Sequence, residues 1–340
     1  MKTGVFGNKD TTGLVLNYFI KDNWPLNNLV CISPSSKLSN SISGYHNPEH
    51  WKLPKNVEVI FTNSYSLNHE NDKKLILSLK LDLIFVIGWQ RLIPEWLLNS
   101  LKVGAFGMHG SSEPLPSGRG RSPLNWSIIQ GKKQFQTNLF KYEAGIDDGN
   151  IVGSDIFEIN EHDTGGSLQM KNTFSMIKLL KSYKNELLTN SFITIDQPSD
   201  VIPTFYPKRR PVDGQILWGL SSNEIDRLVR AVSFPFPGAK SFINDVEITV
   251  WEGYSIAIGE FDKTSIGEVV YIDSNKNIII RCGDGFYCIT NYQSEKENIK
   301  VGDILKSKSD HCWDPEKLPI TSSKYCSTYE DIPEEYRKYV

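Results

Sequence analysis

The chain has 340 residues, a length that suits two domains better than one hydrophobic core. Hydrophobic residues make up 39% of it and charged residues 23%, as in ordinary globular proteins. The net charge of −3 and the pI of about 6.1 exclude a general attraction for nucleic acids, and no apolar run approaches the roughly 18 residues of a membrane span.

Both the N-terminus and the cysteines favour a cytoplasmic protein. The opening sequence MKTGVFGNKD leads directly into a strand-like segment and lacks the pattern of a signal peptide. An odd number of unevenly spread cysteines favours reduced thiols over a disulfide framework: Cys31, Cys282, Cys288, Cys312 and Cys326. A zinc site of His311 with the last four cysteines is the alternative, but no CxxC pair supports it, and we predict no bound metal.

The first half of the chain alternates between buried strands and helices. Short apolar runs predict strands over 30–33, 57–61, 82–87 and 103–108. Helical spacing of apolar residues between them predicts helices over 12–22, 73–80 and 94–101. This alternation is typical of a Rossmann-like open parallel sheet with helices on both faces, in which ligands bind beyond the carboxyl ends of the strands.

The second half of the chain has a different sequence pattern. One long amphipathic helix over 164–188 closes the α/β domain, which we place at 1–195, and a proline-rich linker follows at 196–215. A helix over 221–232 precedes short strands with frequent turn residues, over 246–252, 254–261, 266–273, 277–283 and 286–292. These strands predict a small antiparallel β-barrel, OB-like in kind, within a domain over 216–306. The tail over 307–340 is not classified.

His109 is the first candidate for chemistry. It follows the predicted strand 103–108 and begins the loop GMHGSSEPLPSGRGRSPLNW, which is rich in glycine, serine and proline. A histidine at the carboxyl end of a strand is a plausible acid–base group, and the alternative is a histidine that only orders the loop.

Asp147 is the second candidate. The sequence GIDDGNIV places it in a tight turn between strand-like segments over 141–145 and 151–157. A carboxylate held at the same sheet edge can orient an imidazole and raise its basicity. The alternative for Asp147 and Asp148 is ordinary turn chemistry.

Five motifs in order carry a resemblance to a known family. DLIFVIGWQRLIP, GMHGS, RGRSPLNW, GIDDGNIV and HDTGGSL resemble the folate-dependent formyltransferases, which include methionyl-tRNA formyltransferase and the N-formyltransferases of nucleotide-linked amino sugars. In the second half, DGQILW, LVRAVSFPFPGA and ITVWEG resemble the linker, connecting helix and C-terminal barrel of that family. The resemblance covers residues 1–306. The sequence LPSGRGRSP is most similar to the branch of the family that includes pseudaminic-acid-type sugar enzymes.

The resemblance implies transfer of a formyl group from 10-formyltetrahydrofolate to a primary amine. The family's catalytic set is an Asn-x-His at the strand end and an aspartate in the later turn. His109 and Asp147 match its second and third members, whereas Gly107 stands where the family has asparagine. Because an asparagine amide can stabilise the oxyanion, its loss requires a substitute donor or leaves the enzyme slow or inactive.

The same resemblance implies a folate site. The pteridine of the co-substrate, later released as tetrahydrofolate, is expected beside Ile87, Gly88, Trp89, Gln90, Arg91 and Leu92. The loop 143–147, with Ala144 and Gly145, is expected to complete it. Gly88 permits a close approach of the backbone, and Trp89 is either a wall of the site or a packing residue.

The distribution of charged residues indicates which amine accepts the formyl group. The segment 34–55, where tRNA-specific members carry a basic loop, has little net charge. Candidate phosphate-binding residues are Arg119, Arg121, Lys208, Arg209 and Arg210. We therefore favour a nucleotide-linked amino sugar of polysaccharide biosynthesis. A formyltransferase acting on methionyl-tRNA or another amine, an inactive folate- or nucleotide-binding module, and a homodimeric assembly stay open.

Overall fold

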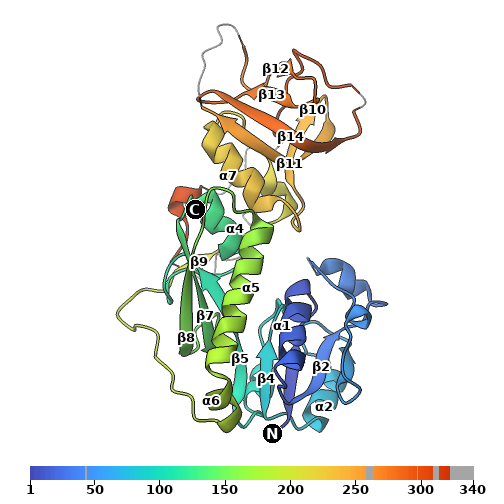
Figure 1. Ribbon diagram of the computed structural model, residues 1–340, viewed down its shortest axis with the longest axis vertical. Coiled ribbons are helices and arrows are strands. Elements are labelled where there is room, and N and C mark those ends of the chain that lie inside the picture. The colour runs from blue at the N-terminus through green and yellow to red at the C-terminus, as the bar shows by residue number, and fades with distance from the viewer. Residues whose placement is uncertain (43, 258–263, 297, 309–313, 322–340) are drawn as a thin grey trace. The chain divides into compact units, whose positions relative to one another are not determined.

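The computed structural model describes residues 1–42, 44–257, 264–296, 298–308 and 314–321 (Figure 1). The chain forms two compact units, each assembled from several stretches of sequence. Unit 1 comprises residues 1–119, 136–157 and 170–203, and unit 2 comprises residues 120–135, 158–169 and 204–340. None of the helices in the described ranges is long and apolar enough to cross a membrane.

Unit 1 is built on a seven-stranded sheet with the strand order β3-β2-β1-β4-β5-β7-β8. The strands are β1 (Thr3–Phe6), β2 (Leu26–Ile32), β3 (Glu58–Thr62), β4 (Leu83–Val86), β5 (Gly104–Ser111), β7 (Gln134–Lys141) and β8 (Ile151–Glu158). The first five strands pair in parallel, which confirms the Rossmann-like open sheet. β7 pairs antiparallel with β5, so the sheet is mixed at this side.

Helices cover both faces of this sheet. They are α1 (Asp10–Lys21), α2 (Glu70–Ser78), α3 (Glu95–Leu98), α5 (Gly165–Ser182) and α6 (Lys184–Thr189). On one face, apolar residues of α1, α5 and α6, such as Phe19, Met176 and Leu187, pack on the strands. On the other face, Ile76 of α2 and Leu97 of α3 pack on Val30 and Val86. Burial of these apolar stripes is what holds the helices to the sheet.

The single helix predicted over 164–188 is wrong in one respect. Two helices, α5 and α6, are separated by Tyr183, whose backbone leaves the helical region (φ −106°, ψ 14°). The Tyr183 ring packs over Gly153 of β8, where an added Cβ would lie 2.3 Å from the ring. The break therefore coincides with a tyrosine that fills the space left by a glycine.

Unit 2 contains a five-stranded antiparallel sheet with the order β10-β11-β14-β13-β12. The strands are β10 (Ala239–Ile243), β11 (Val246–Ile256), β12 (Val269–Ile272), β13 (Ile278–Arg281) and β14 (Phe286–Ser294). The segment 303–306 links the two edge strands: Lys306 exchanges two hydrogen bonds with Phe242, and Val269 donates to the carbonyl of Asp303. The sheet thus closes on itself, and the antiparallel barrel is confirmed.

The strand boundaries in unit 2 differ from the prediction at two places. Separate strands are predicted over 246–252 and 254–261, yet Val246–Ile256 is one continuous strand, and 258–261 lie outside the described residues. Gly253 lets it pass close to β14, because a Cβ there would lie 2.5 Å from the Cys288 carbonyl oxygen. β10 was not predicted, because its sequence AKSFI is short and only two of its five residues are large and apolar.

The remaining elements of the chain are short, apart from α7. They are η1 (Lys37–Ser41), η2 (Pro48–His50), β6 (Arg119–Gly120), α4 (Pro123–Ile129), β9 (Phe205–Tyr206), η3 (Pro211–Gly214), α7 (Ser222–Val232) and η4 (Pro315–Lys317). Within unit 2, α4 packs against α7. The N-terminus of α7 is capped reciprocally by Ser221 and Glu224. The stretch 196–215, predicted as a linker, contains β9 and η3.

Candidate active site

His109 lies inside β5 rather than after it. The parallel pairing of β5 with β4 ends at Gly107, but the antiparallel pairing with β7 continues to Ser111. His109 sits directly opposite Asn138, whose amide donates to the His109 carbonyl oxygen over 3.3 Å. The expectation that the strand ends at 108 is therefore wrong, because β7 extends it. His109 still lies beyond the carboxyl end of β4.

Both nitrogens of the His109 ring face oxygen atoms. Nε2 lies 2.8 Å from the carbonyl oxygen of Gly118, and Nδ1 lies 3.2 Å from Oδ2 of Asp147. Because a carbonyl oxygen can only accept, Nε2 must carry a proton. When one further proton lies between Nδ1 and the Asp147 carboxylate, these two groups attract each other. The ring is 7% exposed, so this proton is screened from bulk water.

The turn that carries Asp147 is fixed by a residue far away in sequence. Asp147 adopts a left-handed conformation (φ 49°), which the sequence GIDDGN tolerates. The side-chain amide of Gln197 donates to the carbonyl oxygens of Asp147 and Gly149, both over 2.8 Å. β7 ends at Lys141, so the strand expected over 141–145 is wrong: the chain bends there to form the turn.

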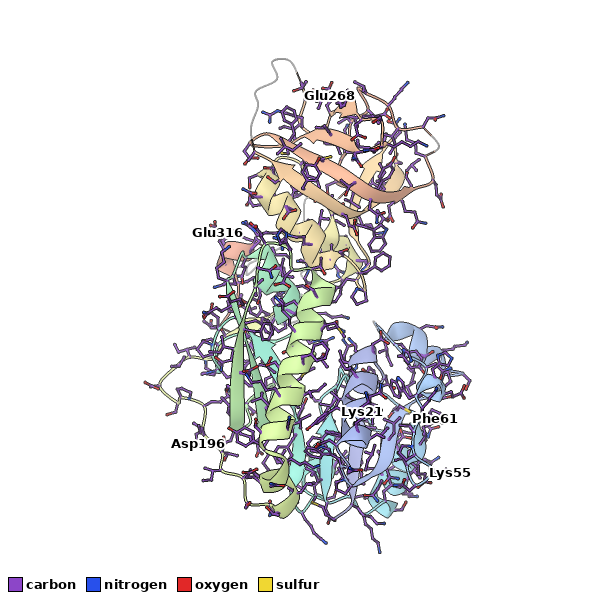
Figure 2. All side chains as sticks on the ribbon, viewed as in Figure 1. Lys21, Lys55, Phe61, Asp196, Glu268 and Glu316 are labelled. Atoms are coloured by element: carbon purple, nitrogen blue, oxygen red, sulfur yellow. The ribbon has the colours of Figure 1, made fainter. Side chains whose placement is uncertain are left out.

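Gln197 belongs to the extended segment that follows α6. Ile195 and Ile151 exchange two backbone hydrogen bonds of 2.8 Å, and Asp196 accepts one from Asn150 over 2.6 Å. Figure 2 labels Asp196 on this segment. Nothing in the local sequence marked Gln197, because its role depends on this return of the chain to the start of β8.

Arg119 joins the same group of residues. Its Nη2 and Nε donate to the Gln197 amide oxygen over 2.5 and 3.2 Å. Burial lowers the pKa of the Arg119 guanidinium, and the carboxylates of Asp148 and Asp147 oppose that shift. The structure therefore places a partly buried cation beside the His109–Asp147 pair, where it can bind an anionic part of a substrate.

Gly107 lies against Tyr142. A Cβ added at Gly107 would lie 2.5 Å from the ring of Tyr142 and 2.8 Å from the carbonyl oxygen of Val86. Both contacts are shorter than atoms tolerate, so no other residue fits here unless its surroundings move. Sequence reasoning identified Gly107 but missed Tyr142.

The expected folate segment begins at the end of β4. The side chain of Ile87 is buried, and its carbonyl oxygen accepts from Thr12 over 2.6 Å. Gly88 has a positive φ of 75°, and a Cβ there would lie 2.8 Å from Oγ1 of Thr12. Glycine is therefore required at this turn. Trp89 is a packing residue, because its ring is 6% exposed and lies edge-on against Tyr65 and Phe6.

The rest of the expected folate residues are more open. The backbone N–H of Gln90 donates to the Tyr65 hydroxyl oxygen over 2.8 Å, and the Arg91 guanidinium lies over the Tyr65 ring. Leu92 is 53% exposed. Ala144 is exposed and Gly145 is half-buried in the turn before Asp147.

Unpaired buried atoms near these residues fit a polar heterocycle. Among the residues that the structure describes, none forms a hydrogen bond with the buried Oδ1 of Asp148 or with the buried Nε1 of Trp89. The Asp148 oxygen is an acceptor beside Gly145, where a ring N–H or amino group can donate to it. The residues present are thus compatible with a pteridine.

The other candidate phosphate ligands belong to unit 2. The backbone N–H of Arg121 donates to the carbonyl of Tyr206, and Lys208 is exposed. Arg209 stacks on the Trp126 ring at 4.4 Å and lines a cavity of about 730 Å³. Arg210 caps η3 together with Asp213. Of the five basic candidates, Arg119 alone lies in the unit that contains His109 and Asp147.

The cysteines that the structure describes, Cys31, Cys282 and Cys288, are buried free thiols. Within the described ranges, no group of three histidine, cysteine or acidic residues could hold a metal ion. His311, Cys312 and Cys326, which the alternative zinc site requires, lie outside the described residues.

Two family models match the chain. The model "Formyl transferase" matches residues 1–181, and the model "Formyl transferase, C-terminal domain" matches residues 208–309.

Two curated proteins are similar to the chain in sequence. The chain is 37% identical over 174 residues to the bifunctional polymyxin resistance protein ArnA of Wigglesworthia glossinidia brevipalpis, a match that covers 51% of the chain and 26% of the relative. It is 28% identical over 226 residues to a methionyl-tRNA formyltransferase of Ruminiclostridium cellulolyticum, covering 66% of the chain and 71% of the relative. The chain thus spans about a quarter of the first relative.

Solved structures share the fold. The N-formyltransferase of Helicobacter canadensis, in complex with folinic acid and dTDP-3-aminofucose, has a TM-score of 0.58 at 19% identity, covering 86% of this chain and 100% of that one. HypX of Aquifex aeolicus, in complex with tetrahydrofolic acid, has a TM-score of 0.59 at 17% identity, covering 90% of this chain and 46% of that one. The fold and both family models agree with the sequence motifs, and the chain belongs to the formyl transferase family.

Proposed function

We propose that this protein is an N-formyltransferase that moves a formyl group from 10-formyltetrahydrofolate to the primary amine of a nucleotide-linked amino sugar. The observation that carries the proposal is one connected group in unit 1. Gln197 joins the Arg119 cation to the turn that holds Asp147, and Asp147 contacts His109. An acid–base pair and a phosphate-binding cation therefore lie together.

The pair His109–Asp147 handles protons. The reacting amine must be neutral to attack and must lose a proton as its new bond to carbon forms. Nε2 of His109 donates to the Gly118 carbonyl oxygen and therefore cannot accept a proton. The proton lost by the amine is accepted on the other side of the ring, between Nδ1 of His109 and Oδ2 of Asp147. The carboxylate stabilises the imidazolium that results, and the buried setting strengthens this attraction.

The co-substrate supplies an activated formyl group, which is bound at the end of β4 and at the turn 143–148. Gly88 brings the backbone close, and the unpaired Oδ1 of Asp148 offers an acceptor to the ring. Tetrahydrofolate is the second product. The free thiols of Cys31, Cys282 and Cys288 agree with a reducing, cytoplasmic setting for this reaction.

The sugar substrate is supported by Arg119 and by relatives. Arg119 is partly buried and already oriented by Gln197, as a bidentate phosphate ligand needs to be. A structural neighbour from Helicobacter canadensis contains dTDP-3-aminofucose, and another neighbour is described as a sugar 3N-formyl transferase in the presence of dTDP and a formyl-tetrahydrofolate. Both ligands carry a diphosphate that one or two guanidinium groups can bind. Such sugars are building blocks for polysaccharides.

A tRNA is the second candidate substrate. The observation in its favour is the 28% identity to a methionyl-tRNA formyltransferase over 226 residues. Recognition of a tRNA requires many phosphate contacts, yet the net charge of the chain is −3. We therefore rank the sugar first.

Mass spectrometry tests the proposal. The full chain is incubated with 10-formyltetrahydrofolate and a panel of nucleotide-linked amino sugars, and the products are examined for the mass of one added formyl group. We expect one sugar to be formylated rapidly, and Arg119→Ala to raise the KM for that sugar more than it lowers kcat. Release of tetrahydrofolate without any formylated sugar would contradict the proposal.

A further inference from the structure

Tyr142 and Gly107 lie on the same face of the sheet. The Tyr142 N–H donates to the Ala105 carbonyl over 2.8 Å, which continues the β5–β7 pairing by one residue. Gly107 pairs with Phe140, and Phe140 stacks on Tyr142 with ring centroids 4.7 Å apart. Because side chains alternate along strands, positions 105, 107 and 109 face the same side as Phe140 and Tyr142. Tyr142 therefore shares a face with His109.

The Tyr142 side chain occupies the space that a side chain at 107 would need. Its ring Cε2 lies 2.5 Å, and its hydroxyl oxygen 3.0 Å, from the position of a Cβ on Gly107. The ring thus passes over the glycine, and the hydroxyl lies beside the place that a side chain at 107 would occupy. Tyrosine at 142 requires glycine at 107.

The hydroxyl of Tyr142 is available as a donor. Among the residues that the structure describes, none forms a hydrogen bond with it, although Tyr142 is half-buried. Burial, with a smaller effect from the charge of Asp147, raises the pKa of Tyr142 well above its usual range. The phenol therefore keeps its proton at every pH at which the enzyme works, and it lies within electrostatic reach of Asp147.

We propose that the hydroxyl of Tyr142 donates a hydrogen bond to the formyl oxygen during transfer and so replaces the side chain that Gly107 lacks. This inference rests on the proposed function. The amine nitrogen forms a bond to the formyl carbon, and the electron pair of the C=O bond moves to oxygen, where Tyr142 stabilises it. When that pair returns, the bond from carbon to N10 of the folate breaks. The His109–Asp147 pair takes the proton lost by the amine and passes it to N10, which gives tetrahydrofolate and leaves the pair as it began.

The first test removes only the hydroxyl. Tyr142→Phe keeps the ring over Gly107 and its stacking on Phe140, so the fold is retained. We expect kcat to fall by about 10²-fold or more, the usual cost of one lost oxyanion donor, with little change in either KM. Tyr18→Phe is the matched control, because that hydroxyl lies on α1 and donates to Asp22 just after the helix, so its loss should leave kcat unchanged.

The second test exchanges the two side chains. Tyr142→Ala opens the space over Gly107 and should lose at least as much activity as Tyr142→Phe. Adding Gly107→Asn to Tyr142→Ala should recover part of the lost kcat, because an amide donor is restored. The recovery should be incomplete and the Tm lower, because the new Cβ still lies 2.8 Å from the Val86 carbonyl oxygen. A gain in kcat over Tyr142→Ala would not follow if Tyr142 only filled space.

Kinetics are measured with whichever amine the wild-type protein formylates, so a wrong choice of sugar does not affect the comparison. A kcat of Tyr142→Phe within threefold of wild type, or a loss confined to KM, overturns the role of Tyr142. A wild-type protein that formylates no amine at all contradicts both the proposed function and this inference.

Discussion

The side-chain amide of Gln197 donates to the main-chain carbonyl of Asp147 over 2.8 Å, across 50 positions of sequence. The oxygen of the same side-chain amide accepts a hydrogen bond from Arg119. The orientation of the proposed catalytic carboxylate and the position of the proposed phosphate-binding cation therefore depend on one neutral residue. Gln197 reaches the turn because residues 195–197 run beside the start of β8.

Gln197→Ala should reduce kcat/KM for the sugar nucleotide by about 10²-fold, because both Asp147 and Arg119 lose their orientation. Steady-state kinetics measure the loss. The neighbouring variant Asp196→Ala removes a carboxylate whose one hydrogen-bond partner in the described ranges is Asn150, and it should stay within a few-fold of wild type. Equal losses in the two variants would show that the segment matters only as a whole.

His109→Ala and Asp147→Asn should each lower kcat by about 10²–10⁴-fold, the range expected for a lost acid–base group. Folding and folate binding should survive, since neither side chain belongs to the two hydrophobic clusters of unit 1. Thermal unfolding and folate titration provide the controls. Activity of either variant within a few-fold of wild type is incompatible with the assigned roles.

Gly107→Asn in the otherwise natural protein should lower the rate. The new Cβ would lie 2.5 Å from the Tyr142 ring and 2.8 Å from the Val86 carbonyl oxygen, and the backbone oxygen cannot move aside as a flexible side chain can. We expect a loss in kcat together with a lower Tm. A rate above wild type would mean that the asparagine was lost by drift and that the site was not rebuilt around glycine.

Asp72 should make the stability of unit 1 depend on pH. Burial alone would raise the pKa of Asp72, but hydrogen bonds from the backbone and side chains of Asn63 and Ser64 outweigh it and hold the pKa below its usual value. A depressed pKa stabilises the fold above the unfolded-state pKa of about 3.9, and this contribution is lost as pH falls through the folded-state pKa.

Urea unfolding of wild type and Asp72→Asn tests this effect. The wild type should be more stable by about 1–3 kcal/mol near neutral pH, and the difference should shrink below about pH 4. Glu70→Gln, an exposed change in the same first turn of α2, is the control and should show no such difference. A difference that does not change with pH would contradict the account of Asp72.

The core of unit 1 was predictable from sequence because its parallel strands are buried on both faces. Runs such as DLIFVI contain almost nothing but apolar residues, so β4 is evident without neighbours. β7 was missed because QFQTNLFK mixes polar and apolar residues and its Asn138 is buried only through its partners His109, Gln136 and Ser154. The length of β5, and therefore the position of His109 inside it, depends on β7.

Only the site residues that stand in recognisable motifs could be predicted from the sequence. His109 and Asp147 stand in short, distinctive sequences, and the structure brings them to 3.2 Å. Gln197 and Tyr142 have no such context, since their roles arise from a returning segment and from the register of β5 against β7. The relation between Gly107 and Tyr142 is three-dimensional and leaves no pattern along the chain.

The central claim is that the acceptor is a nucleotide-linked amino sugar, and a comparison of kcat/KM for two substrates tests it most directly. One protein preparation is given 10-formyltetrahydrofolate with either the best sugar nucleotide or charged initiator tRNA, at increasing salt. We predict efficient formylation of the sugar with only mild dependence on salt, because a few arginines bind its phosphates. Efficient formylation of the tRNA that declines steeply with salt, with no sugar nucleotide accepted, would contradict the claim.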